Sequence, residues 1–210
     1  MQKIEIIPVK YGASVLPEHM IFEHGDKDKV RPIIFRIFLL KAGERLILVD
    51  AGCETMPGFE MTEFIGPIRA LEKLQLTPEQ ITDVVITHAH HDHIESVTYF
   101  KNADIYIQKD EYESGRNYLT PELRVHTFEE EIEIYPNIRC IRIGGHSKGS
   151  CIVEIKSEGK TYVITGDECY QRECLEKKIP TGTSCCPQKS REFVEKYGDS
   201  SCIMLLCHEE

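Results

Sequence analysis

A cluster of four histidines and one aspartate is the strongest chemical signal in this sequence, which reads T-H-A-H-H-D-H over Thr87–His93. In an extended segment, side chains two positions apart point the same way, so His88 and His90 can hold one cation. Once the chain turns, Asp92 and His93 can face a neighbouring position. Imidazoles suit zinc, iron and similar ions, and a carboxylate adds a hard anionic ligand. The pattern therefore predicts a metal site rather than a solvated histidine-rich turn.

Other residues that could join this site share one feature. Each comes directly after the C-terminal end of an apolar run that predicts a strand. These residues are Asp50, His88, His146, Asp167 and His208. Strand ends hold loops rigidly and let residues that are distant in sequence converge, so we expect all five at one place.

Apolar runs and turn residues predict the elements that position these side chains. The expected strands are 3–9, 33–40, 45–49, 83–87, 104–108, 138–143, 151–155, 161–165 and 202–207. Short polar turns join two pairs of these strands into hairpins, over 33–49 and 151–165. We also expect helices over Pro67–Leu76 and His93–Phe100, and a helix start with proline in its first position at Thr77–Gln80.

Strands mixed with helices in this order are typical of a layered α/β fold. The chain shows no internal repeat, low-complexity tract or linker, so we predict a single domain over residues 1–210. The hydrophobic fraction of 41% and the charged fraction of 29% are those of an ordinary globular protein.

Charge and the lack of a long apolar run limit the partners of the protein. The formal net charge is −10, which argues against nucleic-acid binding. Two divalent cations would add +4 in one spot and bring the total to −6, so a small polar or anionic substrate stays possible at the site. No apolar run approaches the roughly 20 residues that span a bilayer. We predict a cytoplasmic protein of unknown oligomeric state.

The nine cysteines fit a reducing compartment. Their number is odd and no C-x-x-C pair is present, so we expect free thiols, several of them inside strands. The adjacent pair Cys185-Cys186 is interpreted first as two loop thiols without a special role, with a redox or metal role as the alternative.

Together the motifs resemble the metallo-β-lactamase superfamily. H-x-H-x-D-H after a strand is similar to that family's signature. The other motifs follow in the expected order, from about Phe35 to His208: Val49-Asp50-Ala51-Gly52, Gly145-His146-Ser147, Thr165-Gly166-Asp167 and a strand that ends in His208. The resemblance implies a four-layer αβ/βα sandwich with two metal ions at one edge of the paired sheets.

The resemblance also implies a role for each site residue. His88, His90 and His146 would hold one ion, Asp92, His93 and His208 the other, and Asp167 would bridge them. Asp50 would accept a hydrogen bond from a ligand histidine and fix its orientation, although an ordinary turn aspartate is the alternative interpretation. Zinc is the expected metal, with iron and manganese as alternatives.

Within the superfamily the sequence looks most like the acyl-homoserine-lactone lactonases. Tyr170 stands three residues after Asp167, where those lactonases keep a tyrosine that contacts the substrate carbonyl; a packing tyrosine is the alternative. Glu176–Pro187 resembles the polar segment, Ile-Pro and helix start of that family, and Phe128–Asn137 resembles its segment before the lone histidine. By the same resemblance, Asp92, Asp167 and Tyr170 are the expected catalytic residues.

Two departures from the lactonase pattern bear on the substrate. Ile94-Glu95 replaces the usual small pair after the metal motif, which places a carboxylate of unknown role near the site. The chain is also shorter than typical lactonases between Tyr112 and Phe128. Part of the acyl-chain pocket is therefore expected to be missing.

The implied chemistry is ester or lactone hydrolysis. Two cations about 3.5–4 Å apart lower the pKa of a bridging water to near neutrality, and the resulting hydroxide would attack the substrate carbonyl. Tyr170 would help to hold the oxyanion, and Asp92 or Asp167 would relay a proton to the leaving alkoxide. The alternatives are a thioesterase or phosphodiesterase on the same scaffold, a di-iron or dioxygenase redox site, and a non-catalytic metal-binding protein. The complete set of seven ligand candidates disfavours the last.

Overall fold

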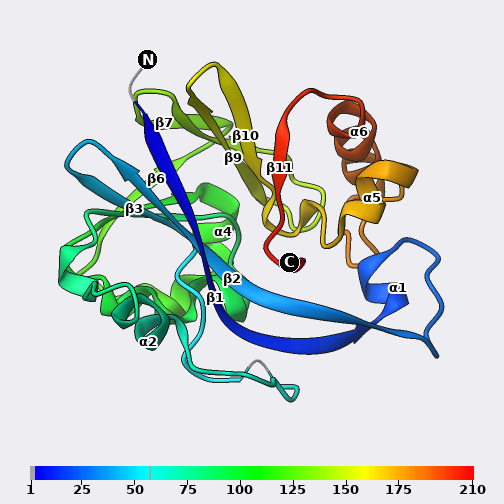
Figure 1. Cartoon of the computed structure of the whole chain (residues 1–210), viewed down its shortest axis with the longest axis horizontal. Coiled ribbons are helices and arrows are strands. Elements are labelled where there is room, and N and C mark those ends of the chain that lie inside the picture. The colour runs from blue at the N-terminus through cyan, green and yellow to red at the C-terminus, as the bar shows by residue number, and fades with distance from the viewer. Residues whose placement is uncertain (1–2, 57) are drawn as a thin grey trace.

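Two β-sheets form the centre of the computed structural model, which describes residues 3–56 and 58–210 (Figure 1). Residues 1, 2 and 57 of the predicted domain lie outside this description. The first sheet has the order β1-β2-β3-β4-β5-β6, with bounds Ile4–Pro17, Val30–Ala42, Arg45–Val49, Asp83–Ile86, Asp104–Gln108 and Arg124–Phe128. The second has the order β11-β10-β9-β8-β7, and the bounds of β7 to β11 are Glu131–Tyr135, Ile138–Arg142, Cys151–Ser157, Lys160–Ile164 and Ile203–Leu205.

Both sheets are mixed. In the first, β1, β2 and β3 are antiparallel neighbours, and β3 to β6 run parallel. In the second, β7 to β10 are antiparallel and β11 pairs parallel with β10. The predicted hairpins β2–β3 and β9–β10 are confirmed. Because β3, β4 and β5 are parallel, their carboxyl ends meet at one edge of the sheet.

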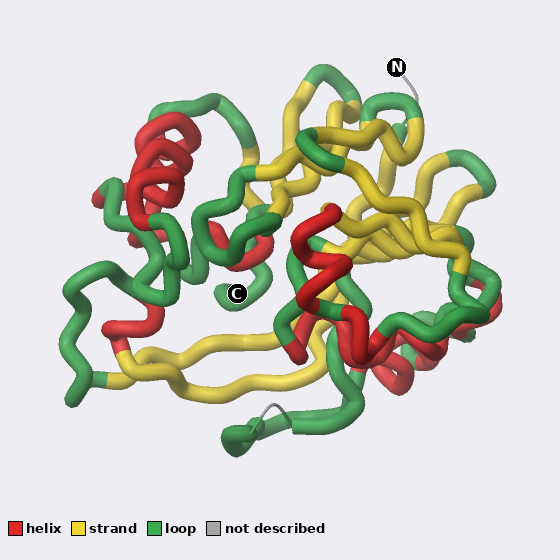
Figure 2. Tube along the Cα trace, turned by 180° about the vertical axis from the view of Figure 1, so that it is seen from behind, coloured by secondary structure: helices red, strands yellow, loops and turns green. Residues whose placement is uncertain are grey.

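The first two strands are much longer than their apolar runs predict. They pair over 14 and 13 residues, with a bulge between Lys10 and Gly12 that shifts the register. Beyond the bulge the two strands run side by side as a curved ribbon that extends away from the rest of the sheet (Figure 2). Such a bulge bends a strand and increases its twist, which turns the ribbon under the site.

Helices cover the outer face of each sheet. The α-helices α1 to α6 are Glu18–Ile21, Pro67–Glu72, His91–Ile94, Lys109–Ser114, Arg172–Lys177 and Pro187–Gly198. Helix α2 packs on β1 and α4 on β5, whereas α5 and α6 pack together beside the second sheet (Figure 1). The layers are thus helix, sheet, sheet, helix, and the predicted four-layer sandwich is confirmed. None of the helices in the described ranges is long and apolar enough to cross a membrane.

Alternating side chains of the same strands serve two cores. Phe38, Leu40 and Val49 point between the sheets, where they meet Val153 and Ile164 of the second sheet. The intervening residues, such as Leu39 and Leu48, belong to the core under the helices. Strands that are buried on both faces need continuous apolar runs, and this is the pattern that made β2, β3 and β4 visible in the sequence.

The sequence prediction missed the strands β6 and β7, and it misjudged the lengths of helices. Helix α2 ends at Glu72 rather than Leu76, because Gln75 takes a left-handed conformation with φ of 61°. Thr77 does cap a helix start with Pro78 in first position, but only a short 3₁₀ turn, Pro78–Gln80, follows. The helix expected over 93–100 is divided into α3 and a 3₁₀ turn over Glu95–Tyr99. Helix α6 begins at Pro187, as the segment resemblance implied.

Candidate metal centre

All seven predicted metal ligands meet at the edge where the two sheets present their strand ends. His88 and His90 lie in the loop after β4, and Asp92 and His93 in α3, which that loop enters. The remaining three follow strands of the second sheet: His146 after β8, Asp167 after β10 and His208 after β11. The ligand atoms form two groups, with His88, His90, His146 and Asp167 in one and Asp92, His93 and His208 in the other.

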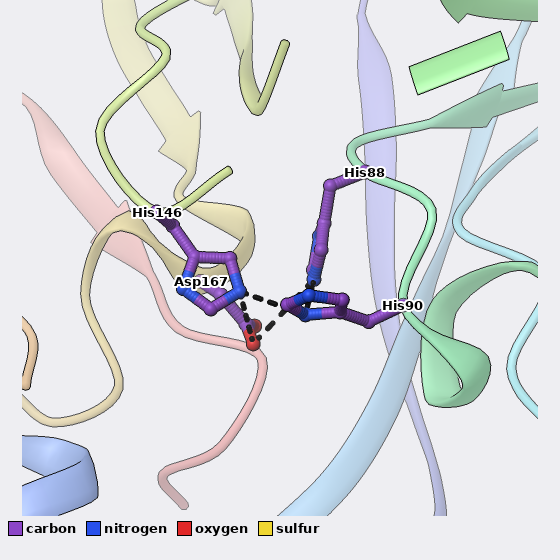
Figure 3. Close-up of side chains that lie close together, drawn as sticks. All are labelled: His88, His90, His146 and Asp167. Atoms are coloured by element: carbon purple, nitrogen blue, oxygen red, sulfur yellow. Dashed lines mark hydrogen bonds and ion pairs between the residues drawn. The ribbon is translucent and has the colours of Figure 1, made fainter. Parts of the chain in front are cut away.

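Three imidazoles and a carboxylate converge in the first group (Figure 3). His90 Nδ1 lies 3.0 Å from His88 Nε2 and 2.9 Å from His146 Nε2. Asp167 Oδ2 lies 3.6 Å from His88 Nε2 and 3.5 Å from His146 Nε2. At such distances the three facing ring nitrogens cannot all carry a proton, so lone pairs point toward one another. A cation placed among the nitrogens would bind these lone pairs.

The second group lies on the other side of Asp167. Asp167 Oδ1 is 2.9 Å from His208 Nε2 and 3.1 Å from His93 Nε2. Asp92 Oδ2 is 3.5 Å from His93 Nε2 and 3.9 Å from His208 Nε2. The two oxygens of Asp167 therefore face different groups, which is the arrangement required of a carboxylate that bridges two ions.

The charges around the two groups fit bound cations. Burial lowers the pKa of His88 well below its ordinary value and that of His146 to about 4, so both rings are neutral and keep a lone pair for a metal. Burial also disfavours charge on His93, but the neighbouring carboxylates, Asp167 first, outweigh it and raise its pKa. Within the described residues, buried His93 Nε2 makes no well-aligned hydrogen bond, although Asp167 Oδ1 lies 3.1 Å away. These donor atoms fit a bound cation.

An outer hydrogen bond orients each histidine that turns Nε2 inward. His93 Nδ1 lies 2.8 Å from Asp50 Oδ2, and His208 Nδ1 lies 2.9 Å from the Ile34 carbonyl oxygen. His88 Nδ1 lies 3.1 Å from the Thr87 hydroxyl. His146 Nδ1 lies 3.2 Å from the Thr183 hydroxyl. An acceptor at Nδ1 keeps the proton there, which leaves Nε2 free to bind a metal ion.

Asp50 is buried and accepts two further hydrogen bonds, from the Thr87 backbone N–H at 2.7 Å and the Thr87 hydroxyl at 2.9 Å. Its backbone is left-handed, with φ of 65°. One carboxylate therefore links the end of β3, the end of β4 and the ring of His93, as its predicted role requires.

Glu111 holds the two histidine loops together and was missed in the sequence. This buried carboxylate accepts hydrogen bonds from Ala89 N at 2.8 Å, Ser147 Oγ at 2.7 Å and Gly149 N at 2.7 Å. It lies three residues beyond the end of β5, so the strand-end rule that found Asp50 could have found it too.

Two more supporting residues carry no local signal. Tyr11, in β1, donates to the Asp92 carbonyl oxygen at 2.7 Å. Glu168 accepts from Gly145 N at 3.1 Å and His146 N at 3.2 Å, and also from the Ser150 hydroxyl. A Cβ at Gly145 would overlap this carboxylate, so only glycine allows the approach. Burial raises the pKa of Glu168 to about 7.

The residues whose roles were left open support loops rather than line the pocket. Glu95 accepts hydrogen bonds from Glu54 N at 2.8 Å and the Thr55 hydroxyl at 3.0 Å, which fixes the segment after Asp50. Cys185 and Cys186 donate backbone N–H bonds to the carbonyl oxygens of His146 and Gly145. All nine cysteines are free thiols, as predicted.

Tyr170 lies in a pocket over the metal ligands. Its ring stacks on His208 with 4.9 Å between centroids, and burial raises its pKa well above the ordinary value, so its hydroxyl keeps its proton. The pocket has a volume of about 260 Å³. Its floor is made of site residues, and its wall is formed by apolar side chains of the β1–β2 ribbon and nearby segments: Leu16, Met20, Ile33, Phe35 and Phe59.

This fold and this donor set define a metallo-hydrolase-type centre, and comparison with known proteins identifies the family. The family model of the metallo-β-lactamase superfamily matches residues 36–191. The chain belongs to this superfamily.

The individual proteins that this chain resembles include lactonases. An N-acyl homoserine lactonase of Bacillus cereus is 26% identical over 170 residues, which are 68% of this chain and 67% of the relative. An N-acyl homoserine lactone hydrolase with N-hexanoyl-L-homoserine bound at its metal centre has a TM-score of 0.82 at 20% identity, covering 99% of this chain and 93% of that one. A dizinc quorum-quenching lactonase has a TM-score of 0.78 at 18% identity, covering 100% and 89%. These structures share the fold.

Proposed function

We propose that this protein is a dinuclear metal-dependent hydrolase that opens the ring of N-acyl homoserine lactones. The observation that carries the proposal is a protonated tyrosine hydroxyl placed in one apolar-walled pocket with both groups of metal ligands. The similarity to N-acyl homoserine lactonases supports the same reaction. The substrate is a small molecule with a lactone or similar ester and an apolar acyl group.

The ligand roles follow from the two groups. His88, His90 and His146 hold one ion, Asp92, His93 and His208 hold the other, and Asp167 lies between them. We propose zinc for both ions, because the donors are imidazole nitrogens and carboxylate oxygens and the similar lactonase is dizinc. When bound, the ions lower the pKa of a water molecule and polarise the ester carbonyl.

Side chains of the pocket carry out the remaining steps of the reaction. Tyr170 donates a hydrogen bond from its hydroxyl to the carbonyl oxygen of the substrate, where negative charge develops, and keeps its proton. Asp167 has both oxygens turned toward histidines, so it is a poor proton carrier. Asp92 lines the pocket and is 17% exposed. We therefore assign a proton relay to Asp92: its carboxylate would take the proton left on the oxygen that water supplies and would pass it to the departing alkoxide.

The pocket wall accounts for the acyl group. Leu16 and Ile33 come from the β1–β2 ribbon, and Phe35 and Phe59 extend the apolar surface toward the ligands. A volume of about 260 Å³ lies below the roughly 300–1,000 Å³ that is common for small-molecule pockets. Short acyl chains should therefore be turned over better than long ones.

Two further parts of the proposal concern the whole chain. Residues 1–210 form one domain, because side chains of both sheets share the core between them; a single cooperative unfolding transition tests this. The protein acts in the cytoplasm, since nine free thiols fit a reducing compartment.

The deciding experiment is a substrate panel with the zinc-loaded protein. Lactones of increasing acyl length are compared with a thioester and a phosphodiester, and the product is read by the mass gain of one water. Ring opening of N-acyl homoserine lactones at rates well above those of the other classes is expected. Preferential cleavage of the thioester or the phosphodiester would replace the lactonase by that hydrolase of the same superfamily.

A further inference from the structure

We infer that Thr183 is a positioning residue: it joins the outer nitrogen of His146 to the hydroxyl of Tyr170 and aims the Tyr170 proton at the substrate. The inference rests on the proposed function, since it assigns a device to the same site. Thr183 Oγ1 lies 3.2 Å from His146 Nδ1 and 3.5 Å from Tyr170 Oη. No motif in the sequence pointed to it.

The direction of the first hydrogen bond follows from the ring of His146. Its Nε2 faces His90 and Asp167, and must keep a lone pair to serve as a ligand. An imidazole that binds a metal through Nε2 carries its proton on the other ring nitrogen, Nδ1, which faces Thr183. His146 Nδ1–H therefore donates, and Thr183 Oγ1 accepts.

The direction of the second bond follows from counting donors and acceptors. Thr181 is buried, and its hydroxyl oxygen lies 3.3 Å from the hydroxyl oxygen of Thr183. If Thr181 donates to Thr183, both acceptor positions of Thr183 are filled, one by Thr181 and one by His146. The Thr183 proton then has one place to go, which is Tyr170 Oη. In the reverse direction the buried Thr181 proton would have no acceptor among the residues that the structure describes, which is costly.

This chain of bonds determines what Tyr170 can do. Tyr170 Oη accepts from Thr183, so its own proton points elsewhere. It can point to the carboxylate of Asp167 or into the pocket that both residues line. The acceptor role toward Thr183 thus restricts the Tyr170 proton to these two directions, which lowers the cost of orienting the phenol toward a substrate carbonyl in the transition state.

The segment that carries Thr183 is held rigidly on both sides, as a positioning role requires. On one side, Glu23 N donates to the Pro180 carbonyl oxygen at 2.8 Å, and Gly182 packs so closely on the His19 carbonyl that a Cβ would overlap it. On the other side, Cys185 N donates to the His146 carbonyl oxygen at 3.0 Å. The hydrogen bond from Cys185 N to the His146 carbonyl oxygen therefore fixes the distance between Thr183 and the loop that carries His146.

The test is a double-mutant cycle with conservative variants. Thr183→Val keeps the shape and removes the hydroxyl, whereas Thr183→Ser keeps the hydroxyl. Each is measured with the zinc-loaded protein and an N-acyl homoserine lactone, with Tyr170 intact and in Tyr170→Phe. Ser184→Ala is the matched control, because it removes the hydroxyl of the next residue, which bonds to the Gly145 carbonyl oxygen and the Ser190 hydroxyl and takes no part in either bond of Thr183.

We expect Thr183→Val to lower kcat about 3- to 10-fold with little change in KM, as for the loss of one ordinary hydrogen bond. Thr183→Ser should stay within about twofold of wild type. In the Tyr170→Phe background, Thr183→Val should cost less than about twofold, because the residue on which it acts is gone. Ser184→Ala should keep kcat within about twofold of wild type.

A readout independent of activity is the ring N–H signal of His146 in protein labelled with ¹⁵N-histidine. At saturating zinc, where both ions stay bound even if the affinity falls, the signal should be present and slow to exchange in wild type and Thr183→Ser, and broadened by exchange in Thr183→Val. Equal losses of kcat from Thr183→Val in both backgrounds, or an unchanged His146 signal, would overturn the inference. A wild-type protein that opens no lactone would instead overturn the proposed function, and the NMR signal would still decide the hydrogen bond.

Discussion

Replacing Asp50 by asparagine tests whether an outer carboxylate sets the metal affinity of the second ligand group. Asp50 Oδ1 accepts from the Thr87 backbone N–H, and Oδ2 accepts from both the Thr87 hydroxyl and the His93 ring N–H. Asparagine tolerates the left-handed backbone at this position, so the loop keeps its path. If the side-chain oxygen of the asparagine keeps the hydrogen bond from Thr87 N–H, its NH₂ group faces the His93 ring N–H, and two donors meet.

The size of the effect follows from that mismatch. A hydrogen bond to a charged group contributes about 1.5–3 kcal/mol, so the free energy of unfolding of the metal-free protein should fall by about this amount. His93 either turns away or moves its proton to Nε2, the atom that faces Asp92 and Asp167. Removing such an outer partner typically lowers metal affinity by about 10- to 100-fold, and the second ion should be affected most.

The assay is competition for zinc against a chelator of known affinity, with urea unfolding of the metal-free protein alongside. Asp83→Asn is the matched control, because Asp83 is equally buried but pairs with Arg45 at the opposite end of β4. It should destabilise the fold and leave zinc affinity within about twofold. Zinc affinity that falls equally in both variants, or in neither, would refute the orienting role of Asp50.

Five further outcomes are expected. His88→Ala should lose most of one zinc equivalent by elemental analysis, and retention of both ions would contradict its assignment. Asp167→Asn should weaken the retention of both ions and abolish turnover of every substrate. Tyr170→Phe should keep two ions and lower kcat for lactones by about 10²–10³-fold. An unchanged kcat in Tyr170→Phe would remove Tyr170 from the mechanism. Intact mass without reductant should show no loss of hydrogen from disulfides, and several defined bridges would contradict the cytoplasmic assignment. The hydrogen bond from His126, ahead of the ion pair with Arg124, lowers the pKa of Asp104 below its ordinary value of 3.8. The contribution of Asp104 to stability is therefore present above that pH and is lost as the pH falls below it. Asp104→Asn should reduce this loss of stability at acid pH, measured by urea unfolding, and an unaltered pH dependence would show that Asp104 does not contribute.

The parts of the site that could be predicted from sequence are those with local signals. The strands β3, β4 and β5 are short apolar runs, and their ends place Asp50 and His88 beside each other because neighbouring parallel strands share an edge. The H-x-H-x-D-H spacing separates the two ligand groups by itself, since the chain turns into α3 after His90.

Supporting contacts could not be predicted, because they join residues that are far apart in sequence. Tyr11 reaches Asp92 across 81 positions, and Thr183 reaches His146 across 37. Their residue types are ordinary for a strand and a loop, so nothing local distinguishes them. The β1–β2 ribbon was underestimated for a similar reason: its outer half is stabilised by cross-strand pairing rather than by a continuous apolar run.

The number of metal ions per chain tests the central claim most directly. The protein is saturated with zinc, freed of excess metal by gel filtration, and analysed for metal and protein in the same sample. Two zinc ions per chain are predicted, because Asp167 turns one oxygen to each of the two ligand groups. One equivalent or less after saturation would contradict the dinuclear centre.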